Sequence, residues 1–233
     1  MRHLRVQVWS DIACPWCYVG KRRLEAAIGR MAEASEVEVV WRAFELDPAA
    51  PRVQPPGKSY AERLARKYGT SIAQADAMIE RMTSIAASDG LTFRFDRVRP
   101  GNTFDAHRLL HLAYERSLQG ALKERLLRAY MTEGEPIGEP TALARLAAEA
   151  GLDPEEVGRV LASDAYAEEV RADEEEARRL GIRAVPFFVF ADASGISGAQ
   201  PVEVLHLALA KAMAEAPQRA PAGGSVCGPE GCG

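Results

Sequence analysis

A pair of cysteines at the junction of a short strand and a helix constrains this fold more than any other feature of the sequence. Residues 4–9 alternate apolar and polar side chains, which predicts a half-buried strand. Cys14 and Cys17 follow after a polar turn, and Pro15 between them suits the first position of a helix. The pattern therefore predicts that Cys14 caps a helix whose first turn carries Cys17.

A thiol at the start of a helix faces unpaired backbone N–H groups and the positive end of the helix dipole, so its thiolate is favoured. Cys17 lies three residues further along the same helix face, within reach of a disulfide with Cys14. We interpret the pair as a dithiol–disulfide exchange site in which Cys14 attacks and Cys17 resolves. A structural disulfide and half of a zinc site are the weaker interpretations.

The composition is that of a globular protein and narrows its possible partners. The chain has 233 residues, of which 47% are hydrophobic, with a net charge of -4 and a pI near 5.7. This balance gives no electrostatic reason to expect binding to nucleic acid or to an anionic membrane. No stretch approaches the roughly 20 apolar residues of a membrane span, and no secretion signal is evident. We therefore expect a cytoplasmic protein whose four cysteines serve catalysis, redox sensing or metal binding.

The other patterns predict an α/β protein whose sheet is divided by a long helical segment. In chain order they predict a strand over residues 36–46, a proline-rich loop over 47–57, helices from 59 to about 180 around an extended connection at 89–95, a strand over 185–190, a turn at Ser194-Gly195, a return strand over 196–199, a helix over 201–216 and a flexible tail over 217–233. The expected division is a domain of residues 1–57 and 181–216, an inserted helical subdomain over 58–180, and the tail.

Pro186 lies near the head of the second decisive motif, the apolar run over residues 185–190. Because proline disrupts a central strand ladder, Pro186 is expected to begin the strand or to occupy a special turn. A cis bond between Val185 and Pro186 would turn the preceding backbone toward a neighbouring site.

With these motifs in this order, the chain resembles the DsbA-family thiol–disulfide oxidoreductases of the FrnE type, which belong to the thioredoxin superfamily. The resemblance covers residues 3 to about 215 and rests on residues 10–20, 102–109, 184–188 and 196–200. It implies a thioredoxin-like fold with a large inserted helical subdomain and a flexible C-terminal tail.

The resemblance also implies roles for individual residues. Cys14 would be the exposed nucleophile and Cys17 its buried partner. A cis Pro186 would lie opposite the pair, and the backbone of Val185 would bind an extended substrate. Apart from the resemblance, Trp16 is either an exposed docking residue or a packed helix residue, and its place between the cysteines favours exposure. The expected substrate-binding residues are Pro15, Trp16, Val185 and Pro186.

Two departures from the family pattern affect the expected chemistry. Many relatives carry a buried acid six positions before the first cysteine, where this chain has Val8. Proton transfer to Cys17 must then rely on water or on another group such as Asp11. DsbA has a histidine between its cysteines that helps to make it strongly oxidising, whereas this chain has Pro15 and Trp16. We therefore expect a less oxidising potential, closer to the range of about -180 to -270 mV between protein disulfide isomerase and thioredoxin than to that of DsbA.

Cys227 and Cys232 form a further pair in the glycine-rich tail, where packing does not explain them. We predict a second redox pair that exchanges with the first, with a metal-binding tail or an incidental dithiol as alternatives. A four-thiolate zinc site that includes the active-site pair has acceptable ligand spacing, but zinc would quench the nucleophile. His107 and His111 have a spacing compatible with a metal, yet no carboxylate motif completes a site, so no metal is predicted.

The sequence thus predicts a cytoplasmic thiol–disulfide oxidoreductase or isomerase that acts on protein or small-molecule thiols through a mixed disulfide at Cys14. No organic cofactor is expected, because the dithiol itself carries two electrons, and the electron donor is unidentified. Kappa-class glutathione transferases and 2-hydroxychromene-2-carboxylate isomerases share the helical insert and are one alternative, but they commonly have serine in place of the first cysteine. A non-catalytic peptide-binding chaperone is the other alternative.

Overall fold

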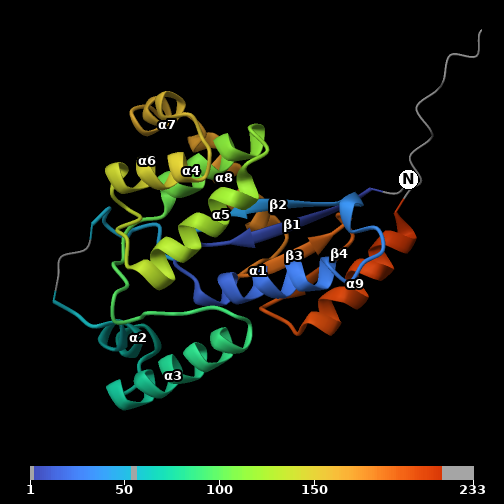
Figure 1. Ribbon diagram of the computed structural model, residues 1–233. Helices are drawn as coiled ribbons and strands as arrows, with labels where there is room; N and C mark the ends of the chain where they lie inside the picture. Colours follow the sequence, from blue (N-terminus) through green and yellow to red (C-terminus); the bar gives the residue numbers. More distant parts are fainter. Residues whose placement is uncertain (1–2, 54–56, 217–233) are drawn as a thin grey trace, which may run out of the picture.

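Strands from the two sides of the helical segment form one sheet at the centre of the molecule (Figure 1). The computed structural model describes residues 3–53 and 57–216. The strands are β1 (Leu4–Ser10), β2 (Val37–Ala43), β3 (Phe187–Phe190) and β4 (Ser194–Ser197), in the spatial order β2-β1-β3-β4. β1 pairs in parallel with β2 and antiparallel with β3, and β3 pairs antiparallel with β4. The expected α/β class, with helices between two halves of one sheet, is confirmed.

Helices α1 (Pro15–Ile28) and α9 (Val202–Glu215) cover one face of this sheet (Figure 1). The core between them and the strands consists of aliphatic and aromatic side chains, among them Val6, Val8, Leu24, Phe188, Phe190, Leu205 and Leu209. Val8 is fully buried in this cluster. An apolar side chain at this position therefore belongs to the sheet core.

Helix α8 (Ala167–Arg179) packs on the other side of the sheet and is attached to it through Asp173. The Asp173 carboxylate accepts hydrogen bonds from the backbone N–H of Ala43 (2.8 Å) and from Arg42 (3.0 Å). Its backbone oxygen accepts a bond from the Trp9 indole at 2.9 Å, and His111 Nε2 lies 3.0 Å from the carboxylate. Asp173 thus connects β1, β2 and α8.

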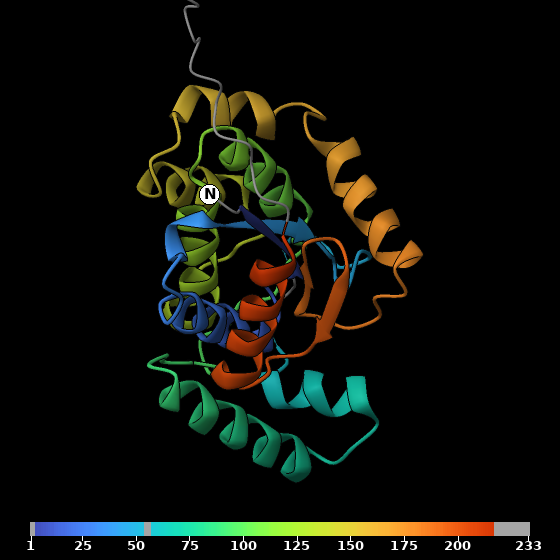
Figure 2. The same cartoon turned by 90° about the vertical axis from the view of Figure 1, so that its right-hand side faces the viewer.

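The helices between β2 and β3 form two groups on opposite sides of the sheet, as Figure 2 shows. One group is α2 (Tyr60–Tyr68) and α3 (Ile72–Ser88), and both begin with a capping box. The other comprises α4 (Phe104–Glu115), α5 (Gln119–Arg128), α6 (Pro140–Glu149) and α7 (Pro154–Leu161), together with α8 and a π-helical turn at Ala129–Glu133. In the part of the chain that the structure describes, no helix is long and apolar enough to cross a membrane.

The turn between β3 and β4 corrects one expectation. Ala191 and Asp192 both have positive φ, 50° and 56°, and the N–H of Ala193 donates to the carbonyl of Phe190 at 3.0 Å. Two consecutive residues of positive φ make the kind of turn that joins twisted antiparallel strands, and aspartate tolerates this conformation. β4 therefore begins at Ser194, and the turn expected at Ser194-Gly195 was placed too late.

Candidate active site

Cys14 lies at the start of α1, as the strand–turn–helix pattern predicts. It is the N-cap residue, with an extended backbone (φ -94°, ψ 113°), and Pro15 follows in the first helical turn. The Cys14 side chain makes no capping hydrogen bond, so its sulfur is left for chemistry. The N–H of Cys17 donates to the carbonyl of Cys14 at 3.0 Å, which holds both thiols in the first turn. Both cysteines are free thiols.

The two thiols differ in environment and therefore in acidity. A hydrogen bond from the Cys17 thiol lowers the pKa of Cys14 below its ordinary value, against the opposing effect of burial. Burial raises the pKa of Cys17 well above its ordinary value. Cys14 is 5% exposed and Cys17 is fully buried, so Cys14 is less accessible than the exposed nucleophile that the resemblance implies. The arrangement favours a thiolate at Cys14 and a protonated thiol at Cys17.

The segment before β3 lies next to the cysteine pair. The peptide bond between Val185 and Pro186 is cis, as expected, and the Val185 carbonyl oxygen lies 3.5 Å from Cys14 Sγ. Helix α1 approaches this segment closely, because a Cβ atom on Gly20 would lie 2.8 Å from the Pro186 ring. The packing of α1 against Pro186 therefore sets the distance between the thiol and the Val185 backbone.

A groove of about 690 Å³ runs past the cysteine pair. Cys14 lines it together with Pro15, Trp16 and Val185, whereas Cys17 does not. Trp16 is half-buried and packs against the apolar clusters on both sides, so the expectation of an exposed Trp16 was wrong. The Trp16 indole, packed in the wall of the groove, contributes apolar surface that a ligand in the groove can contact. Cys14 is the member of the pair that a ligand in the groove can reach.

Positive charges surround the groove although the chain as a whole is acidic. Arg63 and Lys67 of α2 and Arg183 of the segment before β3 line it. None of these three has a carboxylate within ion-pair distance among residues 3–53 and 57–216. The acidic residue of the lining, Glu45, is bonded to Arg171 at 2.6 Å. The groove therefore presents uncompensated positive charge beside an apolar surface.

Buried ionisable groups lie around the turn that leads from β1 to the cysteine pair. Lys123 of α5 is fully buried, and its Nζ donates to the Ser10 carbonyl at 3.4 Å. Asp11 is buried as well, with His107 Nε2 3.5 Å from one carboxylate oxygen. Burial by itself would raise the pKa of Asp11, but hydrogen bonding and the charge of His107, with the N–H of Leu46, hold it below its usual value.

Lys123 was not among the site residues predicted from the sequence, although the pattern of the helix indicates that its position is unusual. The buried positions of α5 are Gln119, Leu122, Lys123, Leu126 and Leu127. These positions follow the spacing of one helix face, so Lys123 lies within an apolar stripe. A lysine in such a stripe is unusual, because lysine is seldom fully buried.

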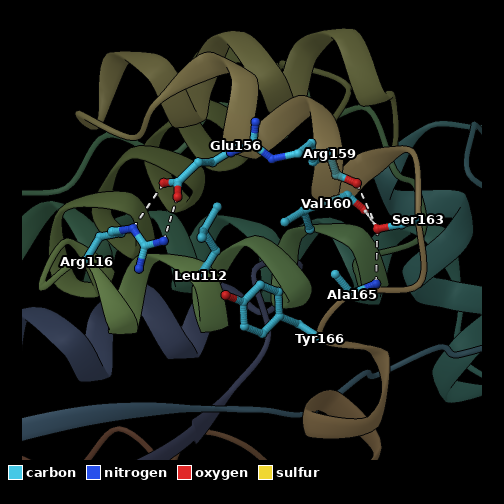
Figure 3. A pocket seen from close by; sticks show the side chains of 8 residues that line it. All are labelled: Leu112, Arg116, Glu156, Arg159, Val160, Ser163, Ala165 and Tyr166. Atoms are coloured by element: carbon cyan, nitrogen blue, oxygen red, sulfur yellow. Dashed lines mark hydrogen bonds and ion pairs between the residues drawn. The ribbon is translucent and has the colours of Figure 1, made fainter.

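A second hollow, of about 220 Å³, lies between α4, α7 and the start of α8 (Figure 3). None of the predicted site residues lines it. The ion pair between Arg116 and Glu156, 2.6 Å apart, lies on one side, and the exposed Arg159 lies on its rim.

Cys227 and Cys232 lie outside the described residues, so their predicted role as a second redox pair stays a prediction. Among residues 3–53 and 57–216, no three metal-ligating side chains come together. His107 and His111 instead lie beside Asp11 and Asp173, respectively.

Comparisons with known proteins agree with this arrangement. Residues 5–210 match the family model of the DSBA-like thioredoxin domain. The structure of a probable DsbA oxidoreductase from Streptomyces coelicolor is 47% identical, covers 99% of both chains and superposes with a TM-score of 0.86. The uncharacterised protein YwbO of Bacillus subtilis is 31% identical, over 88% of this chain and 96% of that one. The cytosolic disulfide reductase DsbM of Pseudomonas aeruginosa, solved with GSH, is 17% identical and shares the fold (TM-score 0.59, over 91% and 96% of the chains).

Proposed function

Because the chain belongs to the DSBA-like thioredoxin domain family, we propose that it is a thiol–disulfide oxidoreductase that works through a mixed disulfide at Cys14. One observation carries the proposal. The thiol with the lowered pKa faces the groove beside the Val185 carbonyl, while its partner is buried behind it. A reactive and a resolving thiol in this order are what disulfide exchange requires.

In the proposed reaction, the Cys14 thiolate attacks one sulfur of a substrate disulfide and expels the other sulfur as a thiolate. Cys17 then gives up its proton and attacks Cys14 Sγ, which releases the second substrate sulfur and leaves a Cys14–Cys17 disulfide. The two enzyme thiols lose two electrons and the substrate disulfide gains them. Attack of two external thiols on the enzyme disulfide restores the starting state.

We propose that a small anionic thiol of the glutathione class supplies these electrons in the cytoplasm. The uncompensated charges of Arg63, Lys67 and Arg183 support this choice, because a thiol that carries carboxylates is attracted to them. The likeness to a cytosolic reductase solved with GSH is a further, fold-level support. The FrnE type and the substrate-binding roles of Pro15, Trp16, Val185 and Pro186 belong to the same proposal.

The double substitution Lys67→Ala/Arg183→Ala is expected to lower kcat/KM for reduced glutathione by about three- to tenfold, since each exposed charge contributes at most about 1 kcal/mol. Steady-state kinetics at several salt concentrations measure this loss, which added salt should diminish. An uncharged thiol substrate, 2-mercaptoethanol, should react equally well with both proteins. Arg159→Ala, on the rim of the second hollow, is the matched control. Equal losses for the charged and the uncharged substrate would contradict a role of these charges in substrate attraction.

Cys17→Ser is expected to trap the proposed intermediate, because the mixed disulfide can no longer be resolved from within. After incubation of this variant, made together with Cys227→Ser and Cys232→Ser, with oxidised glutathione, mass spectrometry should find one glutathione per chain, and peptide mapping should place it on Cys14. A glutathione-dependent isomerase or a peptide-binding chaperone requires no such adduct. An unmodified Cys14 under these conditions would decide against the oxidoreductase.

A further inference from the structure

The most unusual charged group near the cysteine pair is Lys123. Its side chain is fully buried, and no carboxylate lies within ion-pair distance of it in the described part of the chain. By contrast, Lys21, the other buried lysine nearby, is paired with Glu25 and Glu124. Removing a charge from water costs several kcal/mol unless other groups compensate for it. The buried ammonium group of Lys123 must therefore be stabilised by nearby groups other than a contacting carboxylate.

Helix α5 is attached to the free edge of the sheet so that Lys123 lies beside Ser10, at the end of β1 and four residues before Cys14. The side chain of Gln119 accepts a hydrogen bond from the N–H of Trp41 at 2.8 Å and donates to the carbonyl of Trp41 at 2.9 Å. One turn later, Lys123 Nζ lies 5.6 Å from the centre of the Trp41 ring and donates to the Ser10 carbonyl. This fixed attachment holds the ammonium group at a set place in the low-dielectric interior.

The charges that act on Lys123 come from the cysteine pair and its surroundings. Burial lowers the pKa of Lys123 to about 8, and the negative charge of Cys17 is the largest influence that raises it. The charges of Asp11 and Cys14 also raise it, and that of Lys21 lowers it. In return, the positive charge of Lys123 lowers the pKa of Cys17. Lys123 and Cys17 are therefore electrostatic partners across the helix interface.

Asp11 is the other ionisable group available to Cys17, and it is a poor proton acceptor. Its carboxylate accepts hydrogen bonds from the N–H groups of Ala13 and Leu46, at 3.3 and 2.8 Å, and His107 lies against it. These contacts favour the ionised form so strongly that the carboxylate does not hold a proton near neutral pH. Its negative charge also opposes a second negative charge at the cysteine pair.

We propose that Lys123 is the positioning residue that allows the buried Cys17 to ionise and resolve the mixed disulfide, an inference that rests on the proposed disulfide exchange. When Cys17 loses its proton to water, the ammonium group of Lys123 offsets the new negative charge inside the protein. Attack of the Cys17 thiolate on Cys14 Sγ then forms the enzyme disulfide and expels the substrate thiolate, which takes up a proton outside. In the reverse direction, the same positive charge stabilises Cys17 as the leaving thiolate.

Lys123→Met tests the proposal, because methionine fills the space without the charge. Both proteins carry Cys227→Ser and Cys232→Ser, so that only the active-site thiols react; reduced protein is mixed with 5,5′-dithiobis(2-nitrobenzoate), which releases one coloured thiolate when Cys14 attacks and a second when Cys17 resolves. We expect the second release to slow about tenfold at neutral pH and its pH midpoint to rise by about two units. Such a rise lowers the thiolate fraction about 100-fold, which the higher nucleophilicity of a weaker acid partly offsets. The first release should change by less than about threefold.

Leu127→Ala is the matched control, since it removes packing from the same stripe of α5 without removing a charge. It should leave the pH midpoint of the second release unchanged. An unchanged midpoint in Lys123→Met, or an equal slowing of both releases, would overturn the proposal. If wild type itself gives no second release, the proposed disulfide exchange fails rather than the role of Lys123.

A second measurement on the wild-type protein does not depend on a variant that folds. The lysine side-chain ¹³Cε resonance of Lys123 is titrated by NMR in the reduced and in the oxidised protein. The negative charge of the thiolates raises the pKa of Lys123, so oxidation to the uncharged disulfide should lower it. An identical titration in both redox states would contradict the coupling.

Discussion

Replacing Cys14 with serine is expected to abolish disulfide turnover, with a loss of at least about a thousandfold in the reduction of insulin disulfides. The reason is chemical. A serine hydroxyl is not ionised at neutral pH and cannot form a mixed disulfide, whereas the pKa of the Cys14 thiol is lowered by the hydrogen bond from Cys17. No other thiol of the described chain lines the groove.

The measurement is the glutathione-dependent rate for wild type and Cys14→Ser at equal concentration, with circular dichroism to establish that both proteins are folded. Arg159→Ala, at the second hollow, is the control, because it changes an exposed side chain and leaves both active-site thiols in place. Turnover by Cys14→Ser above about one tenth of the wild-type rate would show that another group is the nucleophile.

Asp173→Ala is expected to lower the free energy of unfolding by about 3–5 kcal/mol. The substitution removes a buried carboxylate that bonds to Arg42 and to the backbone of Ala43, and it leaves both donors without their partner. It also removes the anion beside His111. The effect should be large because the carboxylate is buried, whereas exposed ion pairs contribute little.

Urea denaturation followed by circular dichroism measures the change. Glu176→Ala is the matched control, since Glu176 belongs to the same helix and pairs with Arg179 at the surface. The expected change for this variant is less than about 1 kcal/mol. Similar values for the two variants would mean that Asp173 does not connect α8 to the sheet in the way its contacts indicate.

The parts of the site that the sequence predicted are those encoded locally. Cys14, Pro15 and Cys17 follow a strand within a dozen residues, so strand alternation, turn chemistry and helix-start preference all apply to the same short segment. Pro186 at the head of an apolar run is equally local. The family resemblance then related these two segments to each other, which periodicity could not do.

The parts that the sequence did not predict depend on contacts between distant segments. Lys123 reaches the cysteine pair only because α5 docks on the edge of β2 through Gln119. The charge of the groove combines Arg63, near the start of the helical segment, with Arg183, just after its end. Trp16 was expected to be exposed because of its position between the cysteines, but packing from both sides half-buries it.

The position of β1 between β2 and β3 has a consequence for the newly made chain. On the ribosome, β1 and β2 are available early, but β3 follows β1 by about 180 residues, which takes roughly 9 to 35 s at ordinary elongation rates. During this interval the nascent chain carries both active-site cysteines without the Val185 segment that lies beside them. Both cysteines are thus synthesised long before the Val185 segment that completes the groove. A chain whose synthesis stops in this interval has the two cysteines but lacks the complete groove.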